Sequence, residues 1–366
     1  MKKLRTLLTI ILALAISSTV FACSSAPAGE NILPEDVKNV ILLIGDGMGP
    51  NQIKAGEIYK GKQLAMQSIS QKTTVNTNSY SGITDSAAAA TALATGCLTV
   101  NGRVGMDDNL LSLTTIVDKA KSFGKSAGII TTEELYGATP MGFSAHYFDR
   151  SFPHDLLISA ATTSDIDLFA SYTMDSEYID IFTENDYTLI ENPDDISSTT
   201  AQKIIGTYNI KAIFPSMTID GNTIALDRLV SESLDFLSKD EDGFFLMVEG
   251  AHIDHGGHSN LSSYMLSELV AFDDAVNVVL SWAKARKDTI VIVTADHETG
   301  GLQLDPNAKR IGAIQACKWT TGGHTDTPVD LYFYGPAIDF KSISLYKDAN
   351  IIKNTDVFKL ISEYLH

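Results

Sequence analysis

A serine beside an aspartate is the first feature that could do chemistry. Ser86 follows Asp85 and begins an alanine-rich stretch that ends at Gly96. Ala and Leu are strong helix formers and glycine often ends helices, so we expect a helix that begins near Ser86. The backbone N–H groups at such a helix start attract anions such as phosphate. Taken alone, the pattern is more typical of a helix cap than of a nucleophile.

Later in the chain, histidines and carboxylates form a candidate set of zinc ligands. They are Asp254, His258, Asp296, His297 and His324. A single histidine is more often structural than functional. Imidazole together with carboxylate is, however, the ligand set expected for zinc, and three protein ligands with an open position are typical of a catalytic site.

Oxygen ligands for a harder ion occur at three other positions. Asp46, Thr139 and Glu249 offer carboxylates and a hydroxyl, which suit magnesium. A metal ion beside Ser86 would lower the pKa of its hydroxyl and activate it as a nucleophile.

Alternating strands and helices should bring these residues together. Continuous apolar runs, typical of strands buried on both faces of a sheet, occupy residues 37–44, 126–131, 243–248 and 289–294. Helices are expected at residues 51–59 and 113–123, in a segment that carries His146 and Arg150, along the stripe from Met265 to Ala283, and at 357–365. This order predicts an α/β fold with a doubly wound, mostly parallel central sheet flanked by helices on both faces.

The ends of the predicted strands indicate where the site lies. Ligands bind outside the carboxyl ends of the strands in this architecture. Asp46, Thr139, Glu249 and Asp296 all follow predicted strands, so they should converge on one face. Residues from about 151 to 240 carry few chemical signals, and their role stays open.

Six motifs, in the same order along the chain, resemble the alkaline phosphatase family. They are Gly45–Gly49, Thr84–Ala87, Ala138–Pro140 with His146 and Arg150, Val248–Gly250 with Ile253–His255 and His258, Thr294–His297, and Gly323–Thr325. Each motif alone is a weak signal, but six in order are a strong one. The resemblance implies an alkaline phosphatase that hydrolyses small phosphate monoesters through a phosphoserine.

The resemblance also implies a role for each candidate residue. Ser86 would be the nucleophile, and Arg150 would bind two phosphate oxygens through its guanidinium. Two zinc ions and one magnesium ion would be bound, each by three residues, and Ser86 would join one of the zinc ions as a fourth ligand. These sets are Asp254, His258 and His324 for one zinc, Asp46, Asp296 and His297 with Ser86 for the other, and Asp46, Thr139 and Glu249 for magnesium. Homodimers are common in the family, although no residue here proves one.

Two positions depart from the pattern of the family. Gly137 stands where relatives commonly carry Asp or His near the magnesium, so water is expected to replace that contact. His255 occupies a position that varies between Lys and His, and it would either contact phosphate through water or recruit a different metal. The identity of the third ion is therefore open.

Other activities are known on the same scaffold. A sulfatase is disfavoured by Ser86, and Glu249, Thr139 and Arg150 disfavour a mutase or a phosphodiesterase, although diesterase activity stays the chief enzymatic alternative. A lipoprotein that binds phosphate or metal without turnover is the alternative from another class. It predicts a missing nucleophile or ligand, and none is missing.

The N-terminal segment indicates export. A basic start and an apolar run too short to span a bilayer indicate a signal peptide at 1–22, and the pattern before Cys23 resembles a bacterial lipobox. We expect a lipid anchor at Cys23, a tether at 23–35, and one compact catalytic domain at 36–366 without a large inserted subdomain. Phe21 is unusual in a lipobox, so a plain signal peptide on a periplasmic or secreted protein stays open.

Charge and cysteine content limit the partners. Without residues 1–22 the chain has 24 basic and 45 acidic residues, a formal charge of −21. Such an acidic protein is a poor nucleic-acid binder, and no nucleic-acid binding is expected. Cys97 and Cys317 are expected to be two buried free thiols rather than a disulfide.

Overall fold

The apolar runs form one mixed, mostly parallel sheet. The computed structural model describes residues 36–210, 223–305, 307, 309–336 and 351–366, which belong to one unit that extends from Ile32 to His366. In spatial order the strands are β15 (Ile351–Lys353), β2 (Gln71–Asn76), β14 (Val329–Tyr334), β9 (Thr289–Thr294), β1 (Asn39–Gly45), β8 (Phe244–Gly250), β3 (Ser126–Thr131), β4 (Leu168–Tyr172), β6 (Ile204–Ile210) and β5 (Thr188–Leu189). Only β14 runs antiparallel to its neighbours on this path, and β7 (Thr223–Ile224) adds a further parallel pair with β6.

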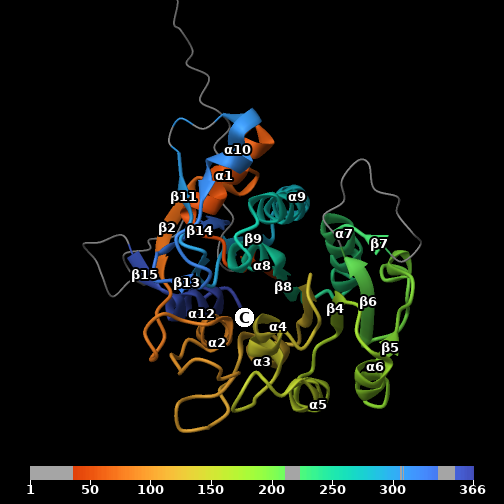
Figure 1. The fold of residues 1–366 in the computed structure, drawn as a ribbon. Coiled ribbons are helices and arrows are strands. Elements are labelled where there is room, and N and C mark those ends of the chain that lie inside the picture. Colours follow the sequence, from red (N-terminus) through yellow and green to blue (C-terminus); the bar gives the residue numbers. More distant parts are fainter. Residues whose placement is uncertain (1–35, 211–222, 306, 308, 337–350) are drawn as a thin grey trace, which may run out of the picture. The chain divides into compact units, whose positions relative to one another are not determined.

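Helices cover both faces of this sheet, which confirms the predicted fold class. The α-helices are α1 (Pro50–Lys60), α2 (Ser86–Thr95), α3 (Ile116–Ser122), α4 (Ala138–Ser144), α5 (Pro153–Thr163), α6 (Ser176–Thr183), α7 (Leu226–Leu237), α8 (His252–His258), α9 (Ser262–Arg286), α10 (Ala313–Ala316) and α12 (Asn354–Ser362). Figure 1 shows α7 and α9 on one side of the central strands and α2, α3 and α4 on the other. The stripe predicted from Met265 to Ala283 is buried in α9.

Two short strand pairs lie outside the main sheet. They are β10 (Glu298–Thr299) with β13 (His324–Thr325), and β11 (Gln303–Leu304) with β12 (Cys317–Lys318). Single 3-10 turns occur at Met66–Ser68, Pro193–Asp195 and Arg310–Gly312. The pairing of β10 with β13 places His324 opposite Thr299, two residues after His297.

The register of the central strands brings the predicted ligands to one edge. Ile44 of β1 lies opposite both Glu249 of β8 and Thr294 of β9, and Thr131 of β3 lies opposite Glu249. Because these four strands are parallel neighbours, their carboxyl ends meet at the same edge of the sheet. Asp46 follows β1 there, and its backbone N–H donates to the Gly250 carbonyl at 3.2 Å.

The helix predicted around His146 and Arg150 is wrong. Helix α4 ends at Ser144, and the chain then becomes extended. Tyr147 and Val104 exchange backbone hydrogen bonds of 2.9 and 3.1 Å, and the Arg150 N–H donates to Gly102 at 2.8 Å. The residues from 102 to 104 therefore take the hydrogen bonds that a helix would have formed within itself.

Two further expectations need correction. The helix predicted from residue 113 begins at Ile116, because Thr115 and Asp118 form a capping box. Cys97 is exposed rather than buried, since it follows the last turn of α2, and Cys317 is half-buried; both are free thiols.

The expectations for the first 35 residues lie outside the described part of the chain. These are the signal peptide, the lipid anchor at Cys23 and the tether. Within the described residues, no helix combines the length and the apolar character that crossing a membrane requires.

Candidate active site

Ser86 is the first residue of α2, as the sequence predicted. Asp85 caps the helix by accepting a 3.0 Å hydrogen bond from the Ala88 N–H, and Gly96 ends it in the left-handed conformation at φ 73°. All ten helix residues are buried, so the position of the serine is rigidly set. The Ser86 Oγ lies 3.2 Å from Nε2 of His297.

One group of candidate ligands combines helix α8 with the strand pair β10–β13. The Nε2 of His258 is 3.2 Å from Asp254 Oδ2, one helical turn earlier, and 3.1 Å from His324 Nε2. The other ring nitrogen, Nδ1, contacts a backbone carbonyl in both histidines, Gly322 at 2.6 Å for His258 and Thr84 at 2.8 Å for His324. Both rings are therefore oriented with Nε2 toward Asp254, an arrangement able to hold a metal ion.

A second group surrounds the serine. Asp46, Asp254 and His297 have ligand atoms within 4.8 Å of one another, and all three residues are buried. Asp296 approaches the same imidazole, with its Oδ2 3.0 Å from His297 Nε2. Its Oδ1 accepts backbone hydrogen bonds from Gly47 at 3.1 Å and from His297 at 2.8 Å, which fix the carboxylate.

Gly47 explains how the two groups come so close. It has a φ of +71°, and a Cβ at this position would meet the Cα of Asp254 at 2.8 Å. A side chain would therefore push α8 away from the end of β1. The glycine in the Gly45–Gly49 motif is needed for this close approach.

The oxygen ligands predicted for magnesium lie at the ends of β1 and β8 and in α4. Thr139 and Glu249 are fully buried, and Asp46 is nearly so. Three of their atoms have no hydrogen-bond partner, namely Asp46 Oδ1, Thr139 Oγ1 and Glu249 Oε1. Leaving buried polar atoms unpaired is costly, whereas a cation would satisfy all three, so these residues fit a metal site.

Burial and like charge shift the carboxyl groups of this region. Burial raises the pKa of both Asp46 and Glu249. The negative charge of Asp296 raises the pKa of Asp46 further, and the negative charge of Glu133 raises that of Glu249. The hydrogen bond that Thr131 donates to Glu249 lowers the pKa of this carboxyl but does not offset its burial. A bound cation would reverse these shifts, since it stabilises the ionised carboxylates.

The histidine-rich group titrates differently. A hydrogen bond with Asp254 raises the pKa of His258 to about 9. Burial would raise the pKa of Asp254, but the hydrogen bond from His258 and the charge of His297 lower it well below its usual range. Asp254 and His258 therefore stabilise each other's charged forms, whereas burial and the charge of His297 lower the pKa of His324.

Arg150 reaches the serine from the loop after α4. Its Nη1 lies 3.4 Å from Asp85 Oδ2, one residue before Ser86, and its side chain is 39% exposed. The guanidinium therefore stands beside the start of α2, where an anion would bind, and remains accessible to a substrate from solvent.

Sequence reasoning missed Glu133, whose side chain fills the space beside Gly137. A Cβ on Gly137 would lie 1.8 Å from Glu133 Oε1, so this space is taken by a carboxylate rather than left for water. His255 lies on the other side, with its Nε2 3.7 Å from Glu133 Oε2. The sequence feature that could have identified Glu133 is its position just past the end of β3, at the edge of the sheet where the other candidate ligands converge.

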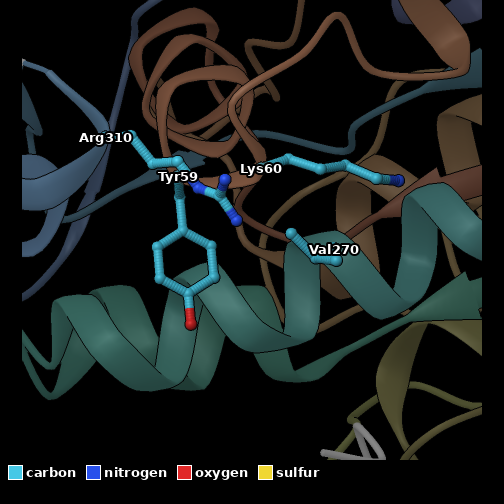
Figure 2. A pocket seen from close by; sticks show the side chains of 4 residues that line it. All are labelled: Tyr59, Lys60, Val270 and Arg310. Carbon is cyan, nitrogen blue, oxygen red and sulfur yellow. The ribbon is translucent and has the colours of Figure 1, made fainter.

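The pocket in Figure 2 is separate from these groups. Its lining residues are Tyr59, Lys60, Val270 and Arg310, and none of them is a predicted site residue. The ammonium of Lys60 already pairs with Asp273 at 2.8 Å and with Asp274 at 2.7 Å. Lys60 is therefore already paired, and no residue that lines this pocket belongs to the serine site.

Comparisons with known proteins agree with this arrangement. The family model for alkaline phosphatase matches residues 37–182 and 172–360. Alkaline phosphatase 3 of Bacillus subtilis is 28% identical, over 86% of this chain and 74% of its own. The structure of alkaline phosphatase from the Antarctic bacterium TAB5 has a TM-score of 0.76 and 30% identity, covering 90% of this chain and 98% of its own. A variant of that enzyme, with Mg bound in the M3 site, has a TM-score of 0.74 and 29% identity over the same shares.

Proposed function

The chain belongs to the alkaline phosphatase family of phosphate-monoester hydrolases, and we propose that it works through a phosphoserine at Ser86 with two zinc ions and one magnesium ion. The observation that carries this proposal is the position of the Ser86 hydroxyl. It lies at the start of α2, 3.2 Å from His297, beside the buried carboxylates of Asp46 and Asp296.

The ligand assignment follows the two groups of side chains. Asp254, His258 and His324 would hold one zinc ion; Asp46, Asp296 and His297 the other, together with Ser86; and Asp46, Thr139 and Glu249 the magnesium ion. Mixed imidazole and carboxylate suits zinc, while oxygen-only ligands suit magnesium. When bound, the ions lower the pKa of the Ser86 hydroxyl and stabilise the negative charge of the transferring phosphoryl group.

The residues of the chain position the substrate and the nucleophile. The rigid start of α2 aims the Ser86 oxygen, and its backbone N–H groups favour the anionic phosphoryl group. Arg150 offers two parallel donors that can hold two nonbridging oxygens, so that the leaving oxygen can lie opposite the serine. Because phosphoryl transfer depends mainly on positioning and charge stabilisation, this placement supports attack by Ser86, release of the alcohol, and later hydrolysis of the phosphoserine.

The test is hydrolysis of p-nitrophenyl phosphate by the purified protein with zinc and magnesium at alkaline pH. We expect release of p-nitrophenol from the wild type, loss of release in Ser86→Ala, and a phosphorylated Ser86 detectable by mass spectrometry after acid quench. Ser81→Ala, which changes an exposed loop serine, is the matched control. Undiminished turnover by Ser86→Ala would exclude the serine mechanism, and preferential cleavage of bis(p-nitrophenyl) phosphate would favour a diesterase.

A further inference from the structure

The backbone conformation at residue 137 does not require a glycine. Its φ of −54° and ψ of 152° are accessible to any residue. What requires the missing side chain is space, because the carboxylate of Glu133 lies where a Cβ would be, 1.8 Å from Oε1 and 2.5 Å from Cδ. The glycine and the glutamate are thus a complementary pair.

The loop that carries Glu133 is held firmly against the site. Thr131, the last residue of β3, accepts the Glu133 N–H at 3.2 Å and donates its hydroxyl to Glu249 Oε2 at 2.5 Å. The Glu133 carbonyl accepts from Tyr172 of the neighbouring strand β4 at 2.9 Å. One hydroxyl therefore links the backbone of Glu133 to a predicted magnesium ligand.

The region next to Glu133 contains polar atoms that need a partner. Gly137 is two residues before Thr139, whose Oγ1 is fully buried and unpartnered, as is Glu249 Oε1. The Glu133 side chain is itself only 17% exposed. Arg150 and His255 are cationic groups that face Glu133, but neither forms a hydrogen bond with the unpartnered oxygens of Thr139 and Glu249, which a metal ion beside Glu133 would satisfy.

We propose that Glu133, from the space over Gly137, supplies a carboxylate to the third ion and makes that site a magnesium site. The inference rests on the proposed function, since it adds a residue to the site of Thr139 and Glu249. With Glu133 the site offers only oxygen atoms, which favour magnesium over zinc. His255, 3.7 Å from the second carboxylate oxygen, orients Glu133 and leaves Oε1 for the ion.

The experiment measures magnesium binding to protein that already holds zinc. Mg²⁺ is titrated by calorimetry into the zinc-loaded wild type, Glu133→Gln and Glu134→Gln, with the zinc content of each determined by elemental analysis. Glu134→Gln is the matched control, because it makes the same change at the next residue. We expect Glu133→Gln, which removes a charged ligand, to weaken magnesium binding by more than about 10-fold, the lower end for a group that only supports a ligand, with two zinc ions retained, and Glu134→Gln to bind like the wild type.

If Glu133→Gln folds poorly, the test can instead move the carboxylate from residue 133 to residue 137. Glu133→Ala removes the group that blocks residue 137, so the double variant Glu133→Ala/Gly137→Asp should regain at least tenfold of the magnesium affinity that Glu133→Ala loses. Gly137→Asp alone should bind magnesium worse than the wild type, because Glu133 still fills the space. Wild-type affinity in Glu133→Gln, or no gain in the double variant, would overturn the role of Glu133. Failure of the zinc-loaded wild type to hydrolyse p-nitrophenyl phosphate would instead contradict the proposed function.

Discussion

The two halves of the site satisfy their buried charges in different ways. In the histidine half, made of Asp254, His258, His297 and His324, imidazoles and carboxylates lie together, as in the 3.2 Å contact of His258 with Asp254. In the carboxylate half, made of Asp46, Glu133, Thr139 and Glu249, the buried oxygens lie beside other oxygens. Asp46, Thr139 and Glu249 each have an atom without a hydrogen-bond partner.

This difference predicts unequal dependence on metal ions. The histidine half can neutralise itself by protonation, since the pKa of His258 is raised to about 9. The carboxylate half relies mainly on keeping protons on its acids, because burial raises the pKa of Asp46 and Glu249 and like charges raise both further. We therefore expect the histidine half to retain its geometry without ions, and the carboxylate half to be the source of metal-dependent stability.

The largest effect is expected where the halves meet, at Asp46. Asp46→Asn keeps the size of the side chain and removes the charge that both halves share. Turnover should fall by more than about 100-fold, because ligand loss exceeds the effect of changing a group that merely supports a ligand. Elemental analysis should find fewer zinc ions and less magnesium per chain than in the wild type.

Asp108→Asn, in an exposed loop, is the matched control for that substitution. A loss of magnesium with zinc unchanged would assign Asp46 to the carboxylate half alone. A full complement of all three ions with wild-type turnover would contradict its place at the junction.

A second difference concerns the pH dependence of the metal-free protein. An acid with a raised pKa favours its protonated form in the folded state, while the unfolded chain ionises at its ordinary pKa, so stability falls as pH rises between the two. For Glu133, whose pKa burial raises from 4.5 to about 7, the loss is of the order of 3 kcal/mol. His258 stabilises the fold below its ordinary pKa of 6.5, and that contribution is lost as pH rises through about 9.

Urea unfolding of chelator-treated protein across this pH range measures both losses. Glu133→Gln should flatten the decline between about pH 4.5 and 7, and His258→Gln the decline between about pH 6.5 and 9. Magnesium binds the ionised carboxylates, so it should restore the stability lost in the lower window, with an effect that grows as pH rises to about 7 and persists above it. A metal-free protein whose stability is constant from pH 4.5 to 9 would refute the comparison.

The fold and the local position of the nucleophile could be predicted from the sequence. Apolar runs such as residues 289–294 indicate buried strands. Asp85 and Gly96 mark the two ends of α2 in the sequence itself. The middle third could not be placed, because β4 and β5 are short, β6 alternates buried and half-buried residues, and the order in which these strands pair depends on contacts far apart in the chain.

The role of Glu133 was hidden for a related reason. Sequence comparison by position shows a ligand missing at residue 137 but not which side chain fills the space. Glu133 can fill the space beside Gly137 because of the turn after β3. In this turn the Gly137 N–H donates to the Glu134 carbonyl at 2.8 Å, which brings residue 133 over residue 137. Similarly, the loop that carries Arg150 is set by its hydrogen bond to Gly102, more than forty residues earlier in the chain.

The smallest effects should come from the two threonines that support the halves. Thr131 donates to Glu249, and Thr299 donates to Asp254 while its Oγ1 lies 3.2 Å from His297 Nδ1. Thr131→Val and Thr299→Val conserve shape and remove one hydroxyl each. Since a group that orients a metal ligand is worth about 10-fold in affinity, or about 1.4 kcal/mol, Thr131→Val should weaken magnesium binding by that factor and Thr299→Val zinc binding. Calorimetric titration of each ion into both variants measures how strongly each substitution weakens the binding of each ion. If either variant weakened the binding of zinc and magnesium equally, the two halves would act as one coupled network.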